Sequence, residues 1–431
     1  MSLRANIDRL VESIPLADTH EHIMEEKRRL EPANGCRLDD FAVLFSHYAD
    51  SDLRVAGMSP DEFNRAMTRG VPWEEKWKLI KPHYLAARNT GYMLAVRLTV
   101  RKLYGEDDIT DKTIGRINEK VHALIKPGFT GHVIKEVAHI DHCQVNSLEV
   151  SPFCETEHPD FLLQDIGTPG LISGWTDRKF WEMAGVGDVK TIEDYHAVLD
   201  GVFAKYGNKA VSTKNQMNYG RRLDFAKVPA KDVAAIFKES LAGARQLTHD
   251  ENKAIQDHLF HYCVDKANEY KLPVKLHAGY YAGHNSMPLH ILRYNGGDMC
   301  DLLKTHRETP FVFMHINYPY QSELVSVCKH YSNAYADMCW AWIINPAASV
   351  RFLKEFLMAA PANKVFTFGG DYRMVETVVG HAAIARRGIA QVLAELVEEG
   401  WMPEGDVEYV ARRIMVDNAR ELFRIHEKFG L

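Results

Sequence analysis

Two histidines stand one residue apart in the segment LADTHEH, residues 16–22. They are His20 and His22, and they follow a short apolar run typical of a β-strand. On a strand, residues i and i+2 point to the same side, so both imidazoles can bind one metal ion. Taken alone, such a pair is more often a turn with two solvated imidazoles. The metal interpretation therefore depends on what the rest of the chain places beside the pair.

Three later apolar runs also end in residues that bind metals or carry protons. They are His277 in VKLHAG, His315 in VFMHIN and Asp371 in TFGGD. Each of the three taken singly is typical of a rim histidine or a helix cap. Together they predict a divalent ion held by His20, His22, His277 and Asp371. Such nitrogen and carboxylate ligands suit Zn²⁺ first, although Mn²⁺, Fe²⁺, Co²⁺ and Ni²⁺ fit them as well.

Other polar side chains near these runs are candidates for substrate binding. Arg373, two residues past Asp371, is predicted to form a two-pronged pair with a substrate carboxylate, with an exposed surface arginine as the alternative. Lys214 in VSTKN and Arg221 in the following NYGRR supply further cations. Tyr318 follows His315 in the turn NYPY. We therefore expect a small-molecule substrate that carries negative charge.

Metal ligands from distant parts of the chain require a fold that gathers strand ends. Eight short apolar runs alternate with helical patterns: IPLADTH, VAHIDHCQV, GLISGW, KAVSTKN, LPVKLHAG, PFVFMHIN, AYADMCW and VFTFGGD. This alternation is typical of parallel strands with crossover helices, and eight units predict an α/β fold, a closed (β/α)8 TIM barrel. An open, doubly wound sheet is the alternative, but no GxGxxG follows the first strand. In a barrel the chemistry lies at the C-terminal strand ends, which is where these residues fall.

Two regions extend the predicted barrel. Residues 36–130 carry apolar residues at helical spacing and predict a mostly helical insertion after the first strand. Aromatic residues in it favour a lid over the barrel mouth or a subunit contact, with a plain helical core as the alternative. After the eighth strand, GDVEYVARRIMVDNARELFRI predicts an amphipathic C-terminal helical extension outside or beneath the barrel. Residues 1–431 are accordingly expected to form a single domain.

The composition excludes several classes of protein. The 431 residues include 46% hydrophobic and 26% charged residues, so a large folded core is expected. A net charge of −6 argues against nucleic-acid binding, and no apolar stretch is long enough to span a bilayer. Seven scattered cysteines without a CxxC pair, and no secretory leader, predict a cytoplasmic protein. A homo-oligomer is expected.

The order of strand-end residues resembles the amidohydrolase superfamily of metal-dependent (β/α)8 enzymes. Lys214 on the fourth strand, KLHAGYY, and NYPY after His315 resemble the amidohydrolase-2 group, in particular hydrolase-like domains related to the FluG N-terminal region. The helical insertion, the Asp371-x-Arg373 pair and the tail ELVEEGWMPEGDVEYVARRIMVDNARELF are similar to uronate isomerase. His315 departs from the isomerase pattern. The superfamily also implies a second interpretation of Lys214, as a carbamylated bridge between two metal ions, which we rank below a simple cation.

These residues favour a metal-dependent hydrolase acting on an amide, ester or lactone. In that reaction Asp371 would take a proton from water and return it to the leaving group, and His315 would stabilise the developing oxyanion. An aldose–ketose isomerase like uronate isomerase is the first alternative, and a decarboxylase of the same superfamily is the second. A barrel with vestigial ligands that serves only as a binding scaffold is the non-enzymatic alternative. The number of candidate ligands argues against it.

Overall fold

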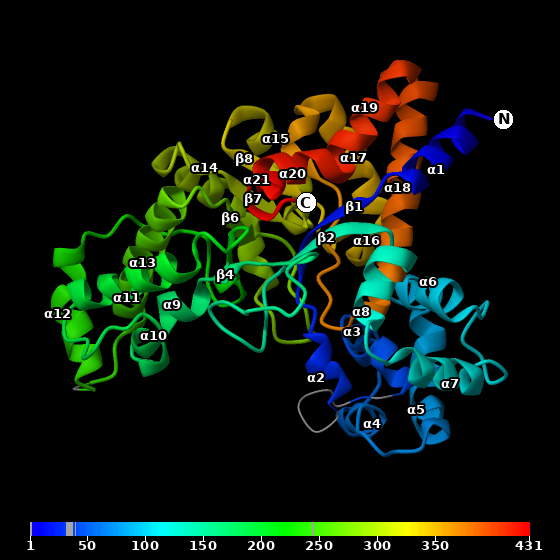
Figure 1. Cartoon of the computed structure of the whole chain (residues 1–431), viewed down its shortest axis with the longest axis horizontal. Coiled ribbons are helices and arrows are strands. Elements are labelled where there is room, and N and C mark those ends of the chain that lie inside the picture. Colours follow the sequence, from blue (N-terminus) through cyan, green and yellow to red (C-terminus); the bar gives the residue numbers. More distant parts are fainter. Residues whose placement is uncertain (1, 32–37, 39, 244) are drawn as a thin grey trace.

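The computed structural model describes residues 2–31, 38, 40–243 and 245–431, and its centre is a ring of parallel strands (Figure 1). Each strand pairs with the next in chain order, in two runs, from β1 to β3 and from β4 to β9. The strands are β1 Leu16–Glu21, β2 Ile140–Val145, β3 Leu162–Gln164, β4 Ile166–Gly167, β5 Thr213–Asn215, β6 Val274–His277, β7 Phe311–Met314, β8 Ala334–Asp337 and β9 Val365–Phe366.

Backbone hydrogen bonds join the two runs of strands into a closed barrel. Strands β3 and β4 form one barrel position, because only Asp165 separates them and its N–H donates to the Val145 carbonyl at 2.9 Å. At the other seam, the Thr19 N–H donates to the Phe368 carbonyl at 3.0 Å, and the Asp371 N–H to the His20 carbonyl at 2.9 Å. The predicted (β/α)8 barrel is therefore confirmed.

The third strand was predicted in the wrong place. The first four residues of GLISGW lie in helix α9, Pro169–Ser173, and the third barrel position is instead residues 162–167. Pro169 stands at the first helical turn, where proline is well tolerated because its missing N–H has no partner to lose. A short apolar run fits a buried helix as well as a strand, so periodicity did not separate the two.

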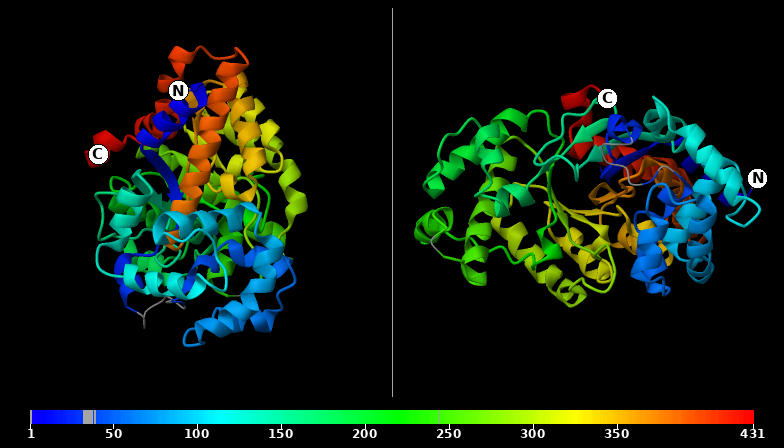
Figure 2. Two further views of the ribbon diagram at one scale, coloured as in Figure 1. Left: turned by 90° about the vertical axis from the view of Figure 1, so that its right-hand side faces the viewer. Right: turned by 90° about the horizontal axis from the view of Figure 1, so that it is seen from below.

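Helices fill the chain between β1 and β2, as predicted for residues 36–130, of which 36, 37 and 39 lie outside the described residues. Figure 1 shows these helices gathered on one side of the barrel, and Figure 2 agrees. They are α2 Glu26–Leu30, α3 Ala49–Val55, α4 Pro60–Ala66, α5 Trp73–Ala87, α6 Gly91–Tyr104, α7 Ile114–Leu124 and α8 Phe129–Gly131, with a 3-10 turn at Phe41–Phe45. Helix α4 begins at a capping box of Ser59 and Glu62.

The helices after β4 cover the rest of the barrel wall (Figures 1 and 2). None of the described helices is long and apolar enough to cross a membrane. The helices are α10 Arg178–Met183, α11 Ile192–Tyr206, α12 Ala230–Leu241, α13 His249–Glu269, α14 Asn295–Thr305, α15 Gln321–His330, α16 Ala341–Ile344, α17 Pro346–Ala359 and α18 Val378–Glu398.

The helices at the two ends of the chain pack against the outside of the barrel. Helix α1, Leu3–Ser13, packs on α18, and the C-terminal extension forms α19 Val407–Arg412, a π-helical turn, α20 Asn418–Leu422 and α21 Ile425–Phe429. The Thr367 N–H donates to the Ile414 carbonyl at 3.2 Å, which ties the extension to the end of β9. The ring of Phe423 lies 5.2 Å from Nζ of Lys275, a side chain buried inside the barrel.

Helix α18 approaches α6 so closely at Gly380 that a side chain there would clash, and this gives a first prediction. A Cβ at Gly380 would lie 1.8 Å from the Ala95 carbonyl oxygen, so Gly380→Ala must push the two helices apart. Forced overpacking of this kind costs about 1–3 kcal/mol. We expect a lower urea midpoint for Gly380→Ala. Gly297 in α14 has open space around its Cβ position, so Gly297→Ala is the matched control and should leave stability unchanged or raise it. Equal stability of the two variants would contradict the close approach.

Candidate metal centre

Three predicted ligands converge at the C-terminal end of the barrel. His20 lies on β1, His22 is the first residue after that strand, and Asp371 lies five residues past β9. Oδ1 of Asp371 is 3.2 Å from Nε2 of His20 and 3.3 Å from Nε2 of His22, and the two imidazole nitrogens are 3.3 Å apart. Donor atoms about 2.0–2.1 Å from a tetrahedral ion are about 3.3–3.4 Å from one another. The triangle therefore has the dimensions of a metal ligand shell.

The hydrogen bonding of His22 fixes which ring nitrogen faces the site. Nδ1 of His22 lies 2.6 Å from the Asn146 carbonyl oxygen, which can only accept, so Nδ1 carries the proton. In neutral imidazole, Nε2 is then a bare lone pair that faces the carboxylate of Asp371. A cation between these two atoms would bind both of them, and a carbonyl behind a histidine is the usual support of a metal ligand. The residues present therefore fit a divalent ion.

His277 and His315 form a second pair with the same property. Nε2 of His277 faces the Tyr280 carbonyl at 2.8 Å, and Nδ1 of His315 faces the Cys339 carbonyl at 3.0 Å. Both outer nitrogens must donate, so the inner ones, Nδ1 of His277 and Nε2 of His315, are bare. These inner nitrogens are 2.9 Å apart. His277 therefore lies against His315, and its binding of one ion together with His20 and His22 stays a prediction.

Burial keeps these imidazoles in the neutral form that binds metals. Removal from water lowers the pKa of His20 and His277 well below the usual value, and it lowers the pKa of His315 to about 4. Burial alone would raise the pKa of Asp371, but its contacts with His20 and His22 hold it well below its usual range. The site thus presents neutral nitrogens around an ionised carboxylate.

Cys339 is a further ligand-type residue that the sequence analysis did not single out. Its sulfur, a nitrogen of His315 and an oxygen of Asp371 all lie within 4.8 Å of one another, and all three residues are buried. It follows β8 by two residues, so the rule that strand ends carry the chemistry could have found it. Cys339 therefore belongs to the group of donors around Asp371.

The helical insertion reaches the metal centre through Tyr48. Its hydroxyl donates to the Asp371 backbone carbonyl at 2.7 Å, and its ring stacks on Trp340 at 4.6 Å. The neighbouring His47 accepts from the Arg373 N–H at 3.1 Å. A cavity of about 260 Å³ opens beside these residues, with Ser46, His47 and Arg373 in its wall. Whether the insertion also acts as a lid or a subunit contact remains a prediction.

Tyr48→Phe is a second prediction. Loss of the hydroxyl removes one support of the loop that carries Asp371, and supports of this kind are worth about 10–100-fold in metal affinity or activity. We expect weaker ion binding by about 10-fold in a chelator-competition titration. Tyr92 belongs to the same aromatic stack, 5.5 Å from Tyr48, without bonding Asp371, so Tyr92→Phe is the control. Unchanged affinity in Tyr48→Phe would show that Asp371 does not depend on the insertion.

The predicted substrate residues lie in different surroundings. Nε of Arg373 pairs with Glu149 at 2.7 Å beside the cavity near Asp371, and its side chain is 33% exposed. Tyr318 accepts a hydrogen bond from the Asn345 side chain at 3.3 Å. Lys214 is buried, with Nζ 2.7 Å from the sulfur of Met314, and burial lowers its pKa to about 8.

Arg221 contributes to a different cavity from Arg373. It bonds the buried Asp257 at 2.5 Å and stacks over Phe225. Together with Arg222 it lines a space of about 760 Å³ beside the loop after β5. The structure therefore brings only Arg373 among the predicted cations into the cavity beside His47.

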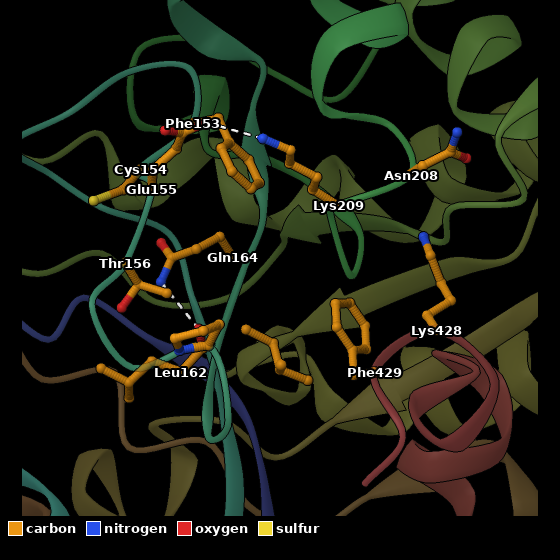
Figure 3. A pocket seen from close by; sticks show the side chains of 12 residues that line it. Phe153, Cys154, Glu155, Thr156, Leu162, Gln164, Asn208, Lys209, Lys428 and Phe429 are labelled. Carbon is orange, nitrogen blue, oxygen red and sulfur yellow. Dashed lines mark hydrogen bonds and ion pairs between the residues drawn. The ribbon is translucent and has the colours of Figure 1, made fainter.

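A further cavity, of about 420 Å³, lies between the loop after β2 and helix α21 (Figure 3). None of the predicted site residues lines it. Lys209, one of its two lysines, is paired with Glu155 at 3.0 Å (Figure 3). Its other lysine, Lys428, donates to the Ala210 carbonyl at 2.6 Å. Both cations are thus engaged within the protein, and we assign no chemistry to this cavity.

Solved structures with the same fold extend over the whole chain. A uronate isomerase from Thermotoga maritima has a TM-score of 0.78 at 16% identity and covers 98% of this chain and 97% of its own. A glucuronate isomerase from Caulobacter crescentus has a TM-score of 0.79 at 16% identity, with coverages of 99% and 94%. A protein described as a metal-dependent hydrolase, from Lactobacillus casei ATCC 334, has a TM-score of 0.68 at 14% identity and covers 99% of each chain. At these identities the likeness shows the fold.

The family is shown by sequence. No curated protein matches the chain. A family model described as Amidohydrolase (Amidohydro_2) matches residues 182–425, which is more than half of the 431 residues and includes β5 to β9 with His277, His315 and Asp371. With its closed (β/α)8 barrel and its cluster of histidines around an aspartate, the chain belongs to the amidohydrolase family, an enzyme family related in fold to uronate isomerase.

Proposed function

We propose that this protein is a metal-dependent hydrolase that cleaves an amide, ester or lactone bond in a small substrate bearing a carboxylate. The observation that carries the proposal is the cluster of imidazole nitrogens gathered around Asp371, with the outer nitrogens of His22, His277 and His315 turned to main-chain carbonyls. A divalent ion, with Zn²⁺ as the first choice, would be held by His20, His22 and Asp371. It would supply an electrophile that polarises the scissile carbonyl and acidifies water.

Asp371 is the proton carrier in this proposal. Its carboxylate is ionised and buried, so it is ready to accept a proton from the attacking water and to return it to the leaving nitrogen or oxygen. Tyr48 fixes the loop that carries Asp371 through the backbone carbonyl and leaves both carboxylate oxygens free of that bond. The insertion therefore orients the acid without consuming its capacity to accept a proton.

His315 is better suited to binding a metal than to stabilising an oxyanion. An oxyanion needs a hydrogen-bond donor, whereas the inward nitrogen of neutral His315 is a bare lone pair. We therefore propose His277 and His315 as ligands of a second ion position next to the first. Lys214, buried and with a pKa near 8, is compatible with both interpretations of its role, the simple cation and the carbamylated bridge.

Recognition of a carboxylate would fall to Arg373. Its guanidinium lines the cavity beside His47 and is held by Glu149, which fixes its direction. A cation in a fixed direction next to the scissile bond favours substrates with a carboxylate near that bond. Arg221 faces another cavity, so we assign it no part in this contact.

Metal analysis and a substrate panel test the proposal. Purified protein should contain at least one divalent ion per chain, lose turnover with a chelator and regain it with Zn²⁺ or Mn²⁺. The panel should contain N-acyl amino acids and carboxylated lactones, with uronic acids as the comparison. A protein that binds no divalent ion would overturn the proposal, and so would ion-dependent turnover confined to uronic acids.

Isomerisation of a uronic acid is the second candidate. The observation in its favour is the match of two isomerase structures over nearly the whole chain, insertion included. The same ion would bind a sugar's carbonyl and adjacent hydroxyl, and Asp371 would move the proton between carbons. Product analysis separates the two, because isomerisation leaves the mass of the substrate unchanged. Decarboxylation, the remaining alternative, would release carbon dioxide.

A further inference from the structure

We propose that Cys339 is a sulfur ligand of the second ion position, so that this amidohydrolase centre binds a thiophilic divalent ion between His315, Cys339 and Asp371. The inference rests on the proposed metal-dependent function and adds a ligand type to it. Its basis is geometric. The sulfur of Cys339, one nitrogen of His315 and one oxygen of Asp371 lie within 4.8 Å of one another and form a group of donors that could hold a metal ion.

The thiol of Cys339 is fully buried and makes no disulfide. Cys339 is 0% exposed, and its sulfur makes no hydrogen bond with any described residue. Its backbone is engaged on both sides, with the N–H bonded to Asp337 at 2.9 Å and the carbonyl to Nδ1 of His315. The main chain thus holds both Cys339 and His315 in fixed positions, and the sulfur is left free on the side of Asp371.

Gly369, two residues before Asp371, makes room for this sulfur. A Cβ at Gly369 would lie 2.7 Å from Cβ of Cys339 and 2.8 Å from its sulfur. A side chain at 369 would therefore displace Cys339 from this position. The first glycine of GGD thus allows Cys339 to pack closely against the segment that carries Asp371, whereas the second, Gly370, lies against Glu21.

A thiolate would change which ions the centre selects. Sulfur ligands favour Zn²⁺ and softer ions, whereas carboxylate and water ligands favour Mg²⁺ and Mn²⁺. Binding converts the thiol to a thiolate, and the proton leaves to solvent as the ion enters. A centre with one sulfur ligand should therefore prefer Zn²⁺ or Co²⁺ over Mn²⁺ at this position.

Cobalt titration of the metal-free full-length protein tests the proposal. Co²⁺ bound to a thiolate gives a strong near-ultraviolet charge-transfer band, which nitrogen and oxygen ligands do not give. We expect this band in the wild type and in Cys143→Ser. In Cys339→Ser we expect the band to be lost, together with one of the bound ions per chain. Cys143 is the matched control, a buried thiol beside another carboxylate, Asp18, at 3.7 Å.

X-ray absorption of the Zn²⁺-loaded wild type gives the same answer without a variant that must fold. We expect a sulfur neighbour at about 2.3 Å in addition to nitrogen and oxygen at about 2.0–2.2 Å. Bound zinc with nitrogen and oxygen neighbours only, or a cobalt band that persists in Cys339→Ser, would overturn the role of Cys339 and leave the proposed hydrolase standing. A wild type that binds no ion would overturn both.

Discussion

Asp371→Asn is expected to lower kcat/KM by about 10²–10⁴-fold, the range that a positioned proton carrier supplies. The variant keeps the shape of the side chain but removes the negative charge that both His20 and His22 face at 3.2–3.3 Å. An amide oxygen is also a weaker metal ligand than a carboxylate, so the content of bound ion should fall with activity. Elemental analysis of the purified variant and steady-state kinetics on the active substrate measure the two effects.

A control must separate loss of the ion from loss of stability. Asp40 is a buried carboxylate of the insertion that bonds Nζ of Lys76 at 2.5 Å and lies outside the proposed site. Asp40→Asn should lower the free energy of unfolding while retaining the ion. If Asp371→Asn retains both the full complement of metal and wild-type turnover, Asp371 is neither a ligand nor the proton carrier.

The second large effect is expected on stability, from Lys275→Met. Nζ of Lys275 lies 3.0 Å from Asp165 and 2.7 Å from the Thr19 carbonyl, and both side chains of the ion pair are 0% exposed. Methionine preserves the volume but leaves the charge of Asp165 buried without its cation, with the Ser212 hydroxyl still donating a hydrogen bond to it. Breaking a buried pair from one side costs about 3–5 kcal/mol. Urea unfolding of the metal-free protein should show this loss.

A double variant and a control at an exposed ion pair test whether the loss of stability comes from an unpaired buried charge. Removal of both charges in Lys275→Met with Asp165→Asn should restore much of the stability, because no uncompensated ion remains. Arg65 and Glu75 form an exposed pair at 2.7 Å, with 54% and 42% of their side chains exposed, so Arg65→Met should cost at most about 1 kcal/mol. A cost for Lys275→Met as small as that of Arg65→Met would be incompatible with a buried ion pair.

Strand ends were predictable where an apolar run stops at one polar residue. His277, His315 and Asp371 follow such runs, and the structure places all three near one another. The third strand failed because its sequence FLLQDIG is broken by Gln164 and Asp165. Asp165 can be buried in mid-strand because Lys275 of β6 pairs with it and the Ser212 hydroxyl donates to it. A short sequence pattern does not reveal a partner such as Lys275, which is more than a hundred residues away.

The candidate site was predictable in its residue types and less so in its pairing. Sequence placed His277 beside His20 and His22, whereas backbone carbonyls turn it toward His315. The helical nature of residues 36–130 follows from periodicity, but the reach of Tyr48 to Asp371 depends on how that insertion docks. Ring orientation and docking are tertiary properties, and neither has a signature in short-range spacing.

The outer nitrogens of three histidines rest on main-chain carbonyls, those of Asn146, Tyr280 and Cys339. A carbonyl is present whatever side chain the residue carries, so no substitution at these positions deletes the support itself. A substitution at position 146, 280 or 339 therefore keeps the carbonyl that orients the imidazole, although it changes the side chain. A chain built in this way can exchange a substrate contact, or recruit a sulfur at position 339, without first dismantling its metal centre.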